Sequence, residues 1–196
     1  MDAMAQLVSA LRCLPGIGPK TAQRMMYKLL AQPGRTHALQ LAKCLHTAMH
    51  DIVNCSLCNN YTTQTICAIC SQKSRDASLL CVVESPADIA AIEHTGLYNG
   101  YYYVLMGKIS PIDGIGPEQI ALAGLTQRAQ HTAIIEIILA LSPSIEGQTT
   151  IYFIQEQLRP YQKKITQFAH GIPSGGELEY LDGHTIGNAL RNRLSA

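Results

Sequence analysis

The sequence predicts an α+β multidomain protein, with a helical N-terminal region, a small four-cysteine module and a C-terminal α/β domain whose sheet is mainly parallel. Three observations predict this fold class. Apolar residues recur at helical spacing near the N-terminus, four cysteines follow in a short segment, and apolar runs then alternate with helical patterns. We expect the domains to cover residues 1–53, 54–76, 77–172 and 173–196, the last being a C-terminal segment with a helix.

Composition and charge distribution limit the classes of protein to which the chain can belong. Of its 196 residues, 47% are hydrophobic and 15% are charged, which excludes disorder driven by charge. The net charge is +1, but residues 1–75 carry a net +6 and residues 76–196 a net −5. Opposite charges in the two parts suggest different partners, and the basic part suits a polyanion.

The hydropathy pattern gives no sign of a membrane or secreted protein. No apolar run approaches the roughly 18 residues of a membrane span, and the N-terminus lacks the basic start and apolar stretch of a signal peptide. We therefore expect a cytoplasmic protein without a membrane partner.

Three amphipathic helices are expected before the cysteine-rich segment. Apolar faces run over residues 4–11 and 19–30, the second helix starting with a proline, and a third face ends at Ile52. Thr36 is the expected N-cap of the third helix.

The turn between the first two helices combines glycines with basic residues. Gly16 and Gly18 allow a ligand to approach the backbone, and the start of the following helix offers free N–H groups to a phosphate. Lys20 and Arg24 are four residues apart and project from one helical face. The string resembles the helix-hairpin-helix motif, which implies contacts to the DNA backbone without base reading. A plain helical turn is the alternative. The similar string Asp113–Pro117 lacks a preceding helix and predicts only a loop and a helix start.

Four cysteines form two Cys-x-x-Cys pairs with eight residues between them: Cys55, Cys58, Cys67 and Cys70. This spacing predicts a tetrahedral zinc site with Zn–S bonds of about 2.3 Å, in which the protein fills every coordination position. The zinc would therefore be structural, one per chain. Two disulfides are the alternative, which a reducing cytoplasm disfavours.

The other cysteines and a histidine pair have simpler interpretations. Cys44 lies on an apolar helical face and Cys81 inside a strand, so both are expected to be small core residues, while Cys13 is left over. His46 and His50 are one helical turn apart but have no obvious third ligand, so we expect surface or core histidines.

Strand and helix patterns alternate through the rest of the chain, which implies parallel pairing through right-handed crossovers. The predicted strands are Leu79–Val83, Tyr101–Met106, Ala133–Leu141 and Ile165–Ala169. Helices are expected from Ser85, from Pro117, over 151–158 and over 186–194.

Acidic residues lie where predicted strands end, which is where ligands gather in open α/β sheets. Glu84 ends the first strand, Asp88 follows four residues later, and Glu146 lies in the loop after the third strand. For Asp88 a capping box with Ser85 is a strong alternative.

This layout resembles the Toprim domain of topoisomerases, primases and related nucleases, in which a glutamate and a later Asp-x-Asp hold Mg²⁺. The corresponding loop here offers Ser142 and Ser144, so that Glu146 is its only carboxylate. Because two-metal chemistry needs several carboxylates, we expect a Toprim fold used for binding, with at most one weakly held Mg²⁺. A Mg²⁺-dependent Toprim nuclease or nicking enzyme is the alternative.

The order of these modules resembles the RecR family of bacterial recombination mediators, over nearly the whole chain. The strings that carry the resemblance are LRCLPGIGPKTAQRM, CVVESPADIAAIE, VLMGKISPIDGIGP and AHGIPSGGELEYLDG. The chain departs from the family pattern at Glu146–Gly147–Gln148, where the family has Glu-Gly-Glu, and this weakens a metal role for the loop.

The resemblance implies a non-enzymatic, cytoplasmic and nucleoid-associated DNA-repair factor that forms a tetrameric ring or a dimer, with the C-terminal segment in oligomer contacts. It would bind single- and double-stranded DNA without sequence specificity. Together with RecO and RecF, it would load RecA onto single-stranded DNA coated by the single-strand-binding protein. Lys20 and Arg24 would face DNA, and Glu84, Asp88 and Glu146 would form an acidic surface that contacts RecO or RecF.

Overall fold

The computed structural model describes residues 2–169, 171–172 and 175–191. The chain divides into two compact units, Met1–Ile52 and Val53–Ala196, and each is described separately. None of the helices in these described residues is long and apolar enough to cross a membrane.

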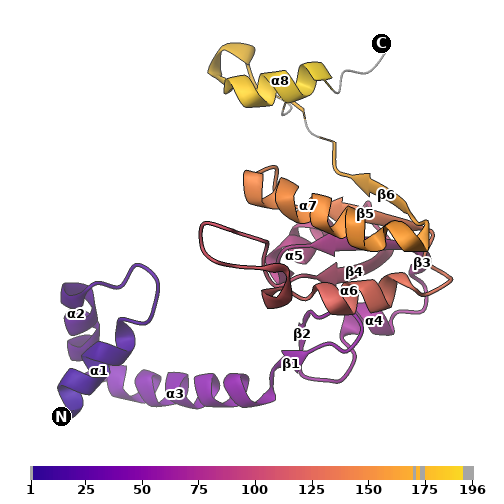
Figure 1. Ribbon diagram of the computed structural model, residues 1–196. Helices are drawn as coiled ribbons and strands as arrows, with labels where there is room; N and C mark the ends of the chain where they lie inside the picture. Colours follow the sequence, from indigo (N-terminus) through magenta and orange to yellow (C-terminus); the bar gives the residue numbers. More distant parts are fainter. Residues whose placement is uncertain (1, 170, 173–174, 192–196) are drawn as a thin grey trace. The chain divides into compact units, whose positions relative to one another are not determined.

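The described residues of the first unit form three helices, which can be followed in Figure 1. They are α1 (Ala3–Leu11), α2 (Pro19–Leu30) and α3 (Gly34–Asp51). The first two begin and end close to the predicted positions. The prediction of Thr36 as the cap of α3 is wrong, because Pro33 occupies that position. The backbone N–H of Thr36 already donates to the Pro33 carbonyl, so Thr36 lies inside the first turn.

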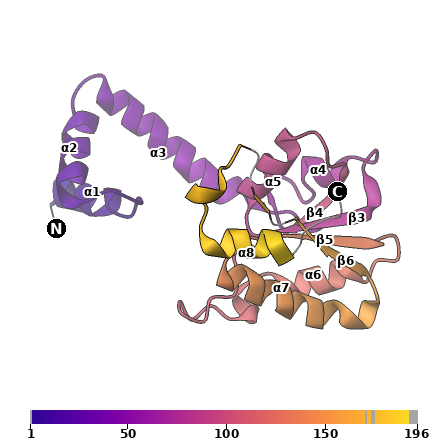
Figure 2. The same ribbon diagram turned by 90° about the horizontal axis from the view of Figure 1, so that it is seen from above.

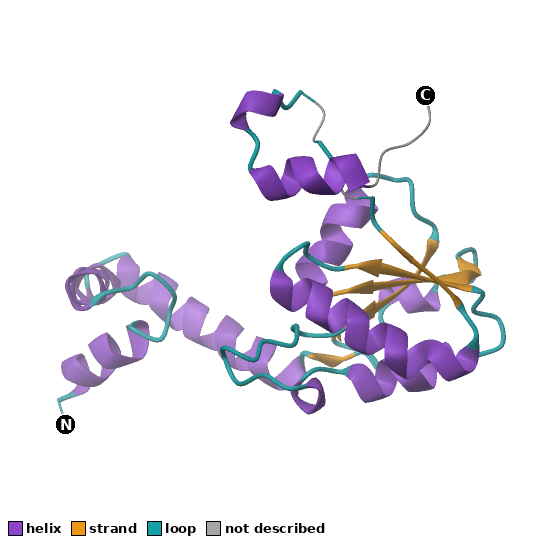
Figure 3. Ribbon diagram, turned by 45° about the horizontal axis from the view of Figure 1, so that its top comes forward, coloured by secondary structure: helices purple, strands orange, loops and turns teal. Residues whose placement is uncertain are grey.

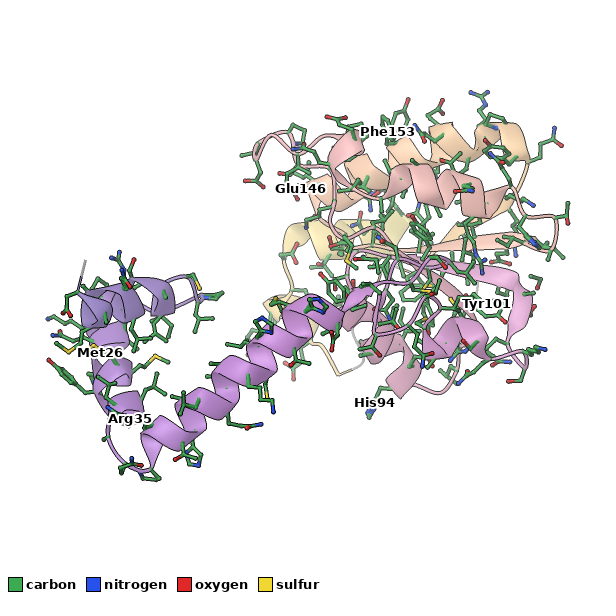
Figure 4. The ribbon with its side chains drawn as sticks, turned by 90° about the horizontal axis from the view of Figure 1, so that it is seen from below. Met26, Arg35, His94, Tyr101, Glu146 and Phe153 are labelled. Carbon is green, nitrogen blue, oxygen red and sulfur yellow. The ribbon has the colours of Figure 1, made fainter. Side chains whose placement is uncertain are left out.

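The first unit has almost no buried side chains of its own. Among its described residues only Ala22 and Met26 of α2 are buried, whereas α1 and α3 bury none; Met26 is labelled in Figure 4. The expectation that Cys44 is a core residue is therefore wrong, since its side chain is exposed on α3. An apolar helical face shows which side needs covering but not whether this chain covers it.

The cysteine-rich segment opens the second unit. A short hairpin pairs β1 (Val53–Asn54) antiparallel with β2 (Tyr61–Thr62), and α4 (Ala68–Ser71) follows. The Asn59 side chain donates to the Val104 carbonyl at 2.8 Å, and the Val104 N–H donates to the Cys58 carbonyl at 2.9 Å. The segment is therefore bonded to the neighbouring sheet.

A four-stranded parallel sheet forms the centre of the second unit (Figure 3). Its strands are β3 (Asp76–Val83), β4 (Gly100–Val104), β5 (Glu136–Ala140) and β6 (Lys164–Gln167). The order across the sheet is β4-β3-β5-β6, so β3 lies between β4 and β5. Every neighbouring pair of strands is parallel. The predicted parallel α/β domain is confirmed.

Helices cover both faces of this sheet. Alternate residues of β3 point to opposite faces and therefore pack in two different cores. Leu80 and Val82 belong to the core under α6 (Leu122–Ala129) and α7 (Ile145–Leu158). Cys81, buried as expected, belongs to the smaller core under α5 (Pro86–His94). Figure 2 shows α6 and α7 on one side of the strands and α5 on the other.

The remaining segments are short. Single turns of 3₁₀-helix cover Pro117–Gln119, Arg159–Tyr161 and Leu178–Tyr180, and α8 covers Gly183–Arg191. Leu194, predicted on the terminal helix, lies outside the described residues. The string Asp113–Pro117 is a loop with Gly114 at φ +67°, followed by the turn that starts at Pro117, as predicted.

Candidate nucleic-acid interface and metal centre

The turn between α1 and α2 places a helix start next to an open backbone. Gly16 has φ +77°, a conformation that L side chains rarely adopt, and a Cβ at Gly16 or Gly18 would meet no atom within 4 Å. Gly18 is the N-cap of α2, and no side chain caps this end of the helix. Because the first N–H groups of a helix have no partner inside it, those of Lys20 and Thr21 are free to bind an anion.

Basic side chains follow this turn along one face of α2. Lys20, Arg24 and Lys28 are spaced by four residues and are all exposed. Arg12, from the end of α1, is exposed as well, and with Lys20 it lines a cavity of about 440 Å³ between the two helices. None of these four cations forms an ion pair within the part of the chain that the structure describes. The face is therefore a set of uncompensated positive charges, suited to a chain of phosphates.

Sequence reasoning named Lys20 and Arg24 but not Lys28 or Arg12. Lys28 could have been found from its spacing, since it is eight residues after Lys20 and so falls on the same face. Arg12 is separated from α2 by the turn, and only the packing of α1 against α2 brings it to the cavity that Lys20 lines.

The four predicted cysteines come together in the second unit. Their Sγ atoms all lie within 4.8 Å of one another, and those of Cys58 and Cys67 are 3.5 Å apart. A zinc ion with Zn–S bonds of about 2.3 Å would hold its four sulfurs about 3.8 Å apart. Cys55, Cys58 and Cys67 are buried and Cys70 is half-buried. The donor set and its spacing therefore fit zinc.

Hydrogen bonds to sulfur also prepare this cluster for a cation. The Cys55 Sγ accepts from the Cys67 N–H at 3.3 Å, and the Cys67 Sγ accepts from the Cys70 N–H at 3.5 Å. Burial raises the pKa of Cys67 to about 11, and a hydrogen bond with Cys70 together with burial raises the pKa of Cys58. Four thiolates this close repel one another unless a cation lies among them.

The three predicted acids at the carboxyl edge of the sheet all follow strands, but they are used differently. Glu84 lies directly after β3, and its Oε1 accepts from the Ser142 N–H at 2.6 Å. Asp88 forms the capping box of α5, where it accepts from the N–H of Ser85 at 2.8 Å. Glu146 lies in the first turn of α7 (Figure 4), where its own N–H and the Ser144 hydroxyl lower its pKa.

A lysine that sequence reasoning missed lies at the same edge. The Lys108 Nζ donates to the hydroxyls of Ser142 at 3.3 Å and Ser144 at 3.2 Å. Lys108 is thus bonded to both serines of the loop after β5, and its charge also lowers the pKa of Glu146. Within the described residues, the cysteine cluster is the only group of three or more His, Cys, Asp or Glu side chains placed to hold a metal.

Comparison with known families covers almost the whole chain. Residues 4–49 match the family model described as RecR, helix-hairpin-helix, and residues 52–72 match the RecR zinc finger domain with four cysteines. Residues 78–169 match the Toprim domain, and residues 171–194 match RecR, C-terminal.

Curated relatives agree with these matches over almost their whole length. Two proteins called "Recombination protein RecR", from Legionella pneumophila subsp. pneumophila and from Legionella pneumophila strain Corby, are each 58% identical to this chain over 193 residues. The alignments cover 98% of this chain and 96% and 98% of the relatives. A third, from Coxiella burnetii, is 48% identical over 189 residues, or 96% of this chain and 94% of its own. The chain therefore belongs to the RecR family of recombination proteins.

Proposed function

We propose that this protein is a DNA-binding recombination mediator in DNA repair. It forms a clamp that acts with RecO and RecF and promotes the loading of RecA onto single-stranded DNA coated by the single-strand-binding protein, at gaps and breaks. The observation that carries this proposal is the row of basic side chains on α2, which form no ion pair with any described residue, next to the open glycine turn, in a chain that belongs to a family of recombination proteins.

DNA binding uses Gly16, Gly18, Lys20 and Arg24. Backbone N–H groups at a helix start and flexible basic side chains bind phosphates, which every sequence shares, so the protein binds single- and double-stranded DNA without sequence specificity. Affinity should fall steeply with salt, because phosphate contacts release counterions.

Self-association follows from the shortage of core in the first unit. A cavity of about 670 Å³ there is lined almost entirely by apolar side chains of α1, α2, α3 and the turn after α1. Leu39 is 69% exposed and Leu45 is 53% exposed. A second copy that covers this surface completes the core, and the resulting dimer, or a tetrameric ring that includes contacts of residues 173–196, is large enough to enclose DNA.

The zinc is structural, one ion per chain. Cys55, Cys58, Cys67 and Cys70 fill all four coordination positions, so no water is left to be activated. When bound, the zinc holds together a segment that has few apolar anchors.

The Toprim domain serves binding rather than catalysis. The carboxyl edge has Lys108 and two serines beside Glu146, so two-metal phosphoryl transfer lacks its ligands, and Mg²⁺ is at most weakly held. Glu84, Asp88 and Glu146 give this edge an acidic surface for RecO or RecF. The protein works in the cytoplasm, at the nucleoid during repair.

A reconstituted loading reaction tests the proposal. With RecO present, the protein should shorten the lag before RecA hydrolyses ATP on single-stranded DNA coated by the single-strand-binding protein. The double variant Lys20→Ala with Arg24→Ala should lose this effect while keeping its fold and zinc content. An unchanged lag in the double variant would refute the role of α2.

A nicking assay tests the non-enzymatic assignment. Purified protein incubated with Mg²⁺ and supercoiled DNA should leave the DNA intact. Nicking that disappears in Glu84→Gln would instead establish a Toprim nuclease.

A further inference from the structure

A second cavity, of about 490 Å³, lies in the second unit between the cysteine-rich segment and α6. Six polar residues take part in its lining: Asn54, Ser56, Asn59, Gln127, Arg128 and His131. None of the described residues that line it is an aspartate or glutamate. Among these lining residues, Arg128 is the only one with a permanent charge, and this charge is positive.

Arg128 is the charged group of this cavity, and its charge has no carboxylate partner among the described residues. The Nε atom is buried without a hydrogen-bond acceptor, and the side chain forms no ion pair with any described residue. The guanidinium lies 5.8 Å from the ring centroid of Tyr101, which is labelled in Figure 4. The ring restricts the position of the guanidinium without neutralising it.

Arg75, in the same unit, differs from Arg128 in that its guanidinium has several hydrogen-bond acceptors. Arg75 donates to both carboxylate oxygens of Glu93, to the Gly100 carbonyl at 2.9 Å and to the Gln72 side chain at 2.8 Å. A buried donor left without an acceptor costs free energy, so arginines that serve the fold are saturated in this way. Arg128 departs from that pattern inside a cavity.

Neighbouring groups of the cavity add donors. The Nδ1 of His131 accepts from the Ala133 N–H at 3.4 Å, so the proton of the neutral ring lies on Nε2, which can donate. Gln127 adds an amide. The cavity wall is fixed, because Tyr103 donates to the Ala121 carbonyl at 2.8 Å and a Cβ on Gly124 would lie 2.2 Å from the Tyr103 hydroxyl oxygen.

We infer that this cavity binds a phosphate group, held mainly by Arg128 with His131 and Gln127 as further donors. A phosphate has several acceptor oxygens and accepts from all three side chains at once, and guanidinium matches its geometry. The phosphate comes either from a nucleic-acid strand or from a free nucleotide or inorganic phosphate. As a nucleic-acid contact, the site rests on the DNA binding proposed above.

The test uses full-length, zinc-loaded protein labelled with ¹⁵N and titrated with inorganic phosphate. The guanidinium N–H resonances of Arg128, those of the Nη groups included, should shift to saturation. Arg128→Gln should weaken phosphate binding by at least about tenfold, the loss expected for a charge-assisted hydrogen bond. Arg159→Gln is the matched control: it removes the same charge from an 80% exposed side chain outside the cavity and should change nothing.

Three results would overturn the inference. The first is an Arg128 resonance that does not respond to phosphate, which leaves a cavity filled by water alone. The second is a response to an acidic peptide but not to phosphate. The third concerns the zinc site, since Cys55 also lines the cavity and four zinc-bound thiolates carry a net charge of −2. If Arg128→Gln lowers zinc affinity and leaves phosphate binding unchanged, Arg128 is only a counter-ion of that site.

Titration with oligo(dT) separates the two sources of phosphate and the two proposals. If the strand is the source, the Arg128 resonance should also shift with oligo(dT), including in the Lys20→Ala, Arg24→Ala variant at low salt. A protein that binds phosphate at Arg128 but no DNA refutes the proposed function and leaves the cavity site. A protein that binds DNA through Lys20 and Arg24 while the Arg128 resonance responds to neither oligo(dT) nor inorganic phosphate refutes the cavity site alone.

Discussion

Asn59 joins the cysteine-rich segment to the sheet, and its replacement should lower the free energy of unfolding of the second unit by an amount that depends on the new residue. Its side chain donates to the carbonyl of Val104 at 2.8 Å and accepts from Asn54 at 2.9 Å. Val104 is fully buried on β4, which is an edge strand of the sheet. Asn59 itself has φ +62°, which asparagine tolerates better than most residues.

Two variants separate the contributions of this residue. Asn59→Gly keeps the backbone conformation accessible but leaves the buried Val104 carbonyl without its partner, which should cost about 2 kcal/mol of unfolding free energy. Asn59→Ala loses the same hydrogen bonds and keeps a Cβ at positive φ, a conformation that alanine tolerates less well than asparagine or glycine, which should add about 1 kcal/mol. The expected order of stability is wild type, Asn59→Gly, Asn59→Ala.

Urea denaturation of the zinc-loaded proteins, followed by circular dichroism, measures these differences. Asn60→Ala is the control, because the Asn60 side chain bonds to the next N–H of its own turn and its loss should cost less than about 1 kcal/mol. Equal stability of the alanine and glycine variants of Asn59 would refute the backbone argument. Two variants as stable as the wild type would refute the contribution of the bond to Val104.

Three further predictions concern the metal, acid stability and thiol exposure. Elemental analysis should give one zinc per chain. Removing this zinc with a chelator should unfold the cysteine-rich segment and expose the edge of β4, so the treated protein should aggregate. A protein that keeps its stability without zinc would contradict this. The hydrogen bond from Arg75 lowers the pKa of Glu93 below its usual 4.5, so the stability it contributes is present above that pH and is lost as the pH falls through the lowered value. Glu93→Gln should lower the free energy of unfolding by about 2 kcal/mol at pH 7, which is less than for a fully buried ion pair because the Glu93 side chain is 31% exposed. The stability of this variant should also fall less steeply as the pH is lowered. An unchanged pH dependence would count against the ion pair between Arg75 and Glu93. A thiol reagent should modify the exposed Cys44 quickly, whereas Cys81, whose pKa burial raises to about 12, should react only after unfolding, as mass spectrometry of tryptic peptides would show; equal rates for the two would contradict their assigned environments.

The features that the sequence predicts well are those encoded by local spacing. Cys55 and Cys58, like Cys67 and Cys70, lie three residues apart, a spacing typical of structural zinc sites, and the four side chains do come together. The alternation of apolar strands with helices likewise requires parallel crossovers, and the sheet is parallel throughout.

The features that escaped prediction depend on contacts between distant segments. Lys108 follows β4, yet it bonds to Ser142 and Ser144 because β4 and β5 flank β3, an order that no local pattern encodes. Arg128 looks like an ordinary basic residue on α6 until the cysteine-rich segment closes a cavity around it. For Cys44, helical periodicity identified the apolar face, but no described residue of the first unit buries the Cys44 side chain.

The salt dependence of DNA binding is the most direct test of whether α2 binds the phosphate backbone. We expect the logarithm of the affinity for oligo(dT) to fall linearly with the logarithm of salt concentration, and Lys20→Ala with Arg24→Ala to reduce the slope by about 1.4, or about 0.7 for each lost phosphate contact. Arg159→Ala with Lys164→Ala, which removes two exposed charges from the second unit, should leave the slope unchanged. An affinity and slope that stay the same in the α2 variant, or no binding by the wild type even at low salt, would refute DNA binding through α2.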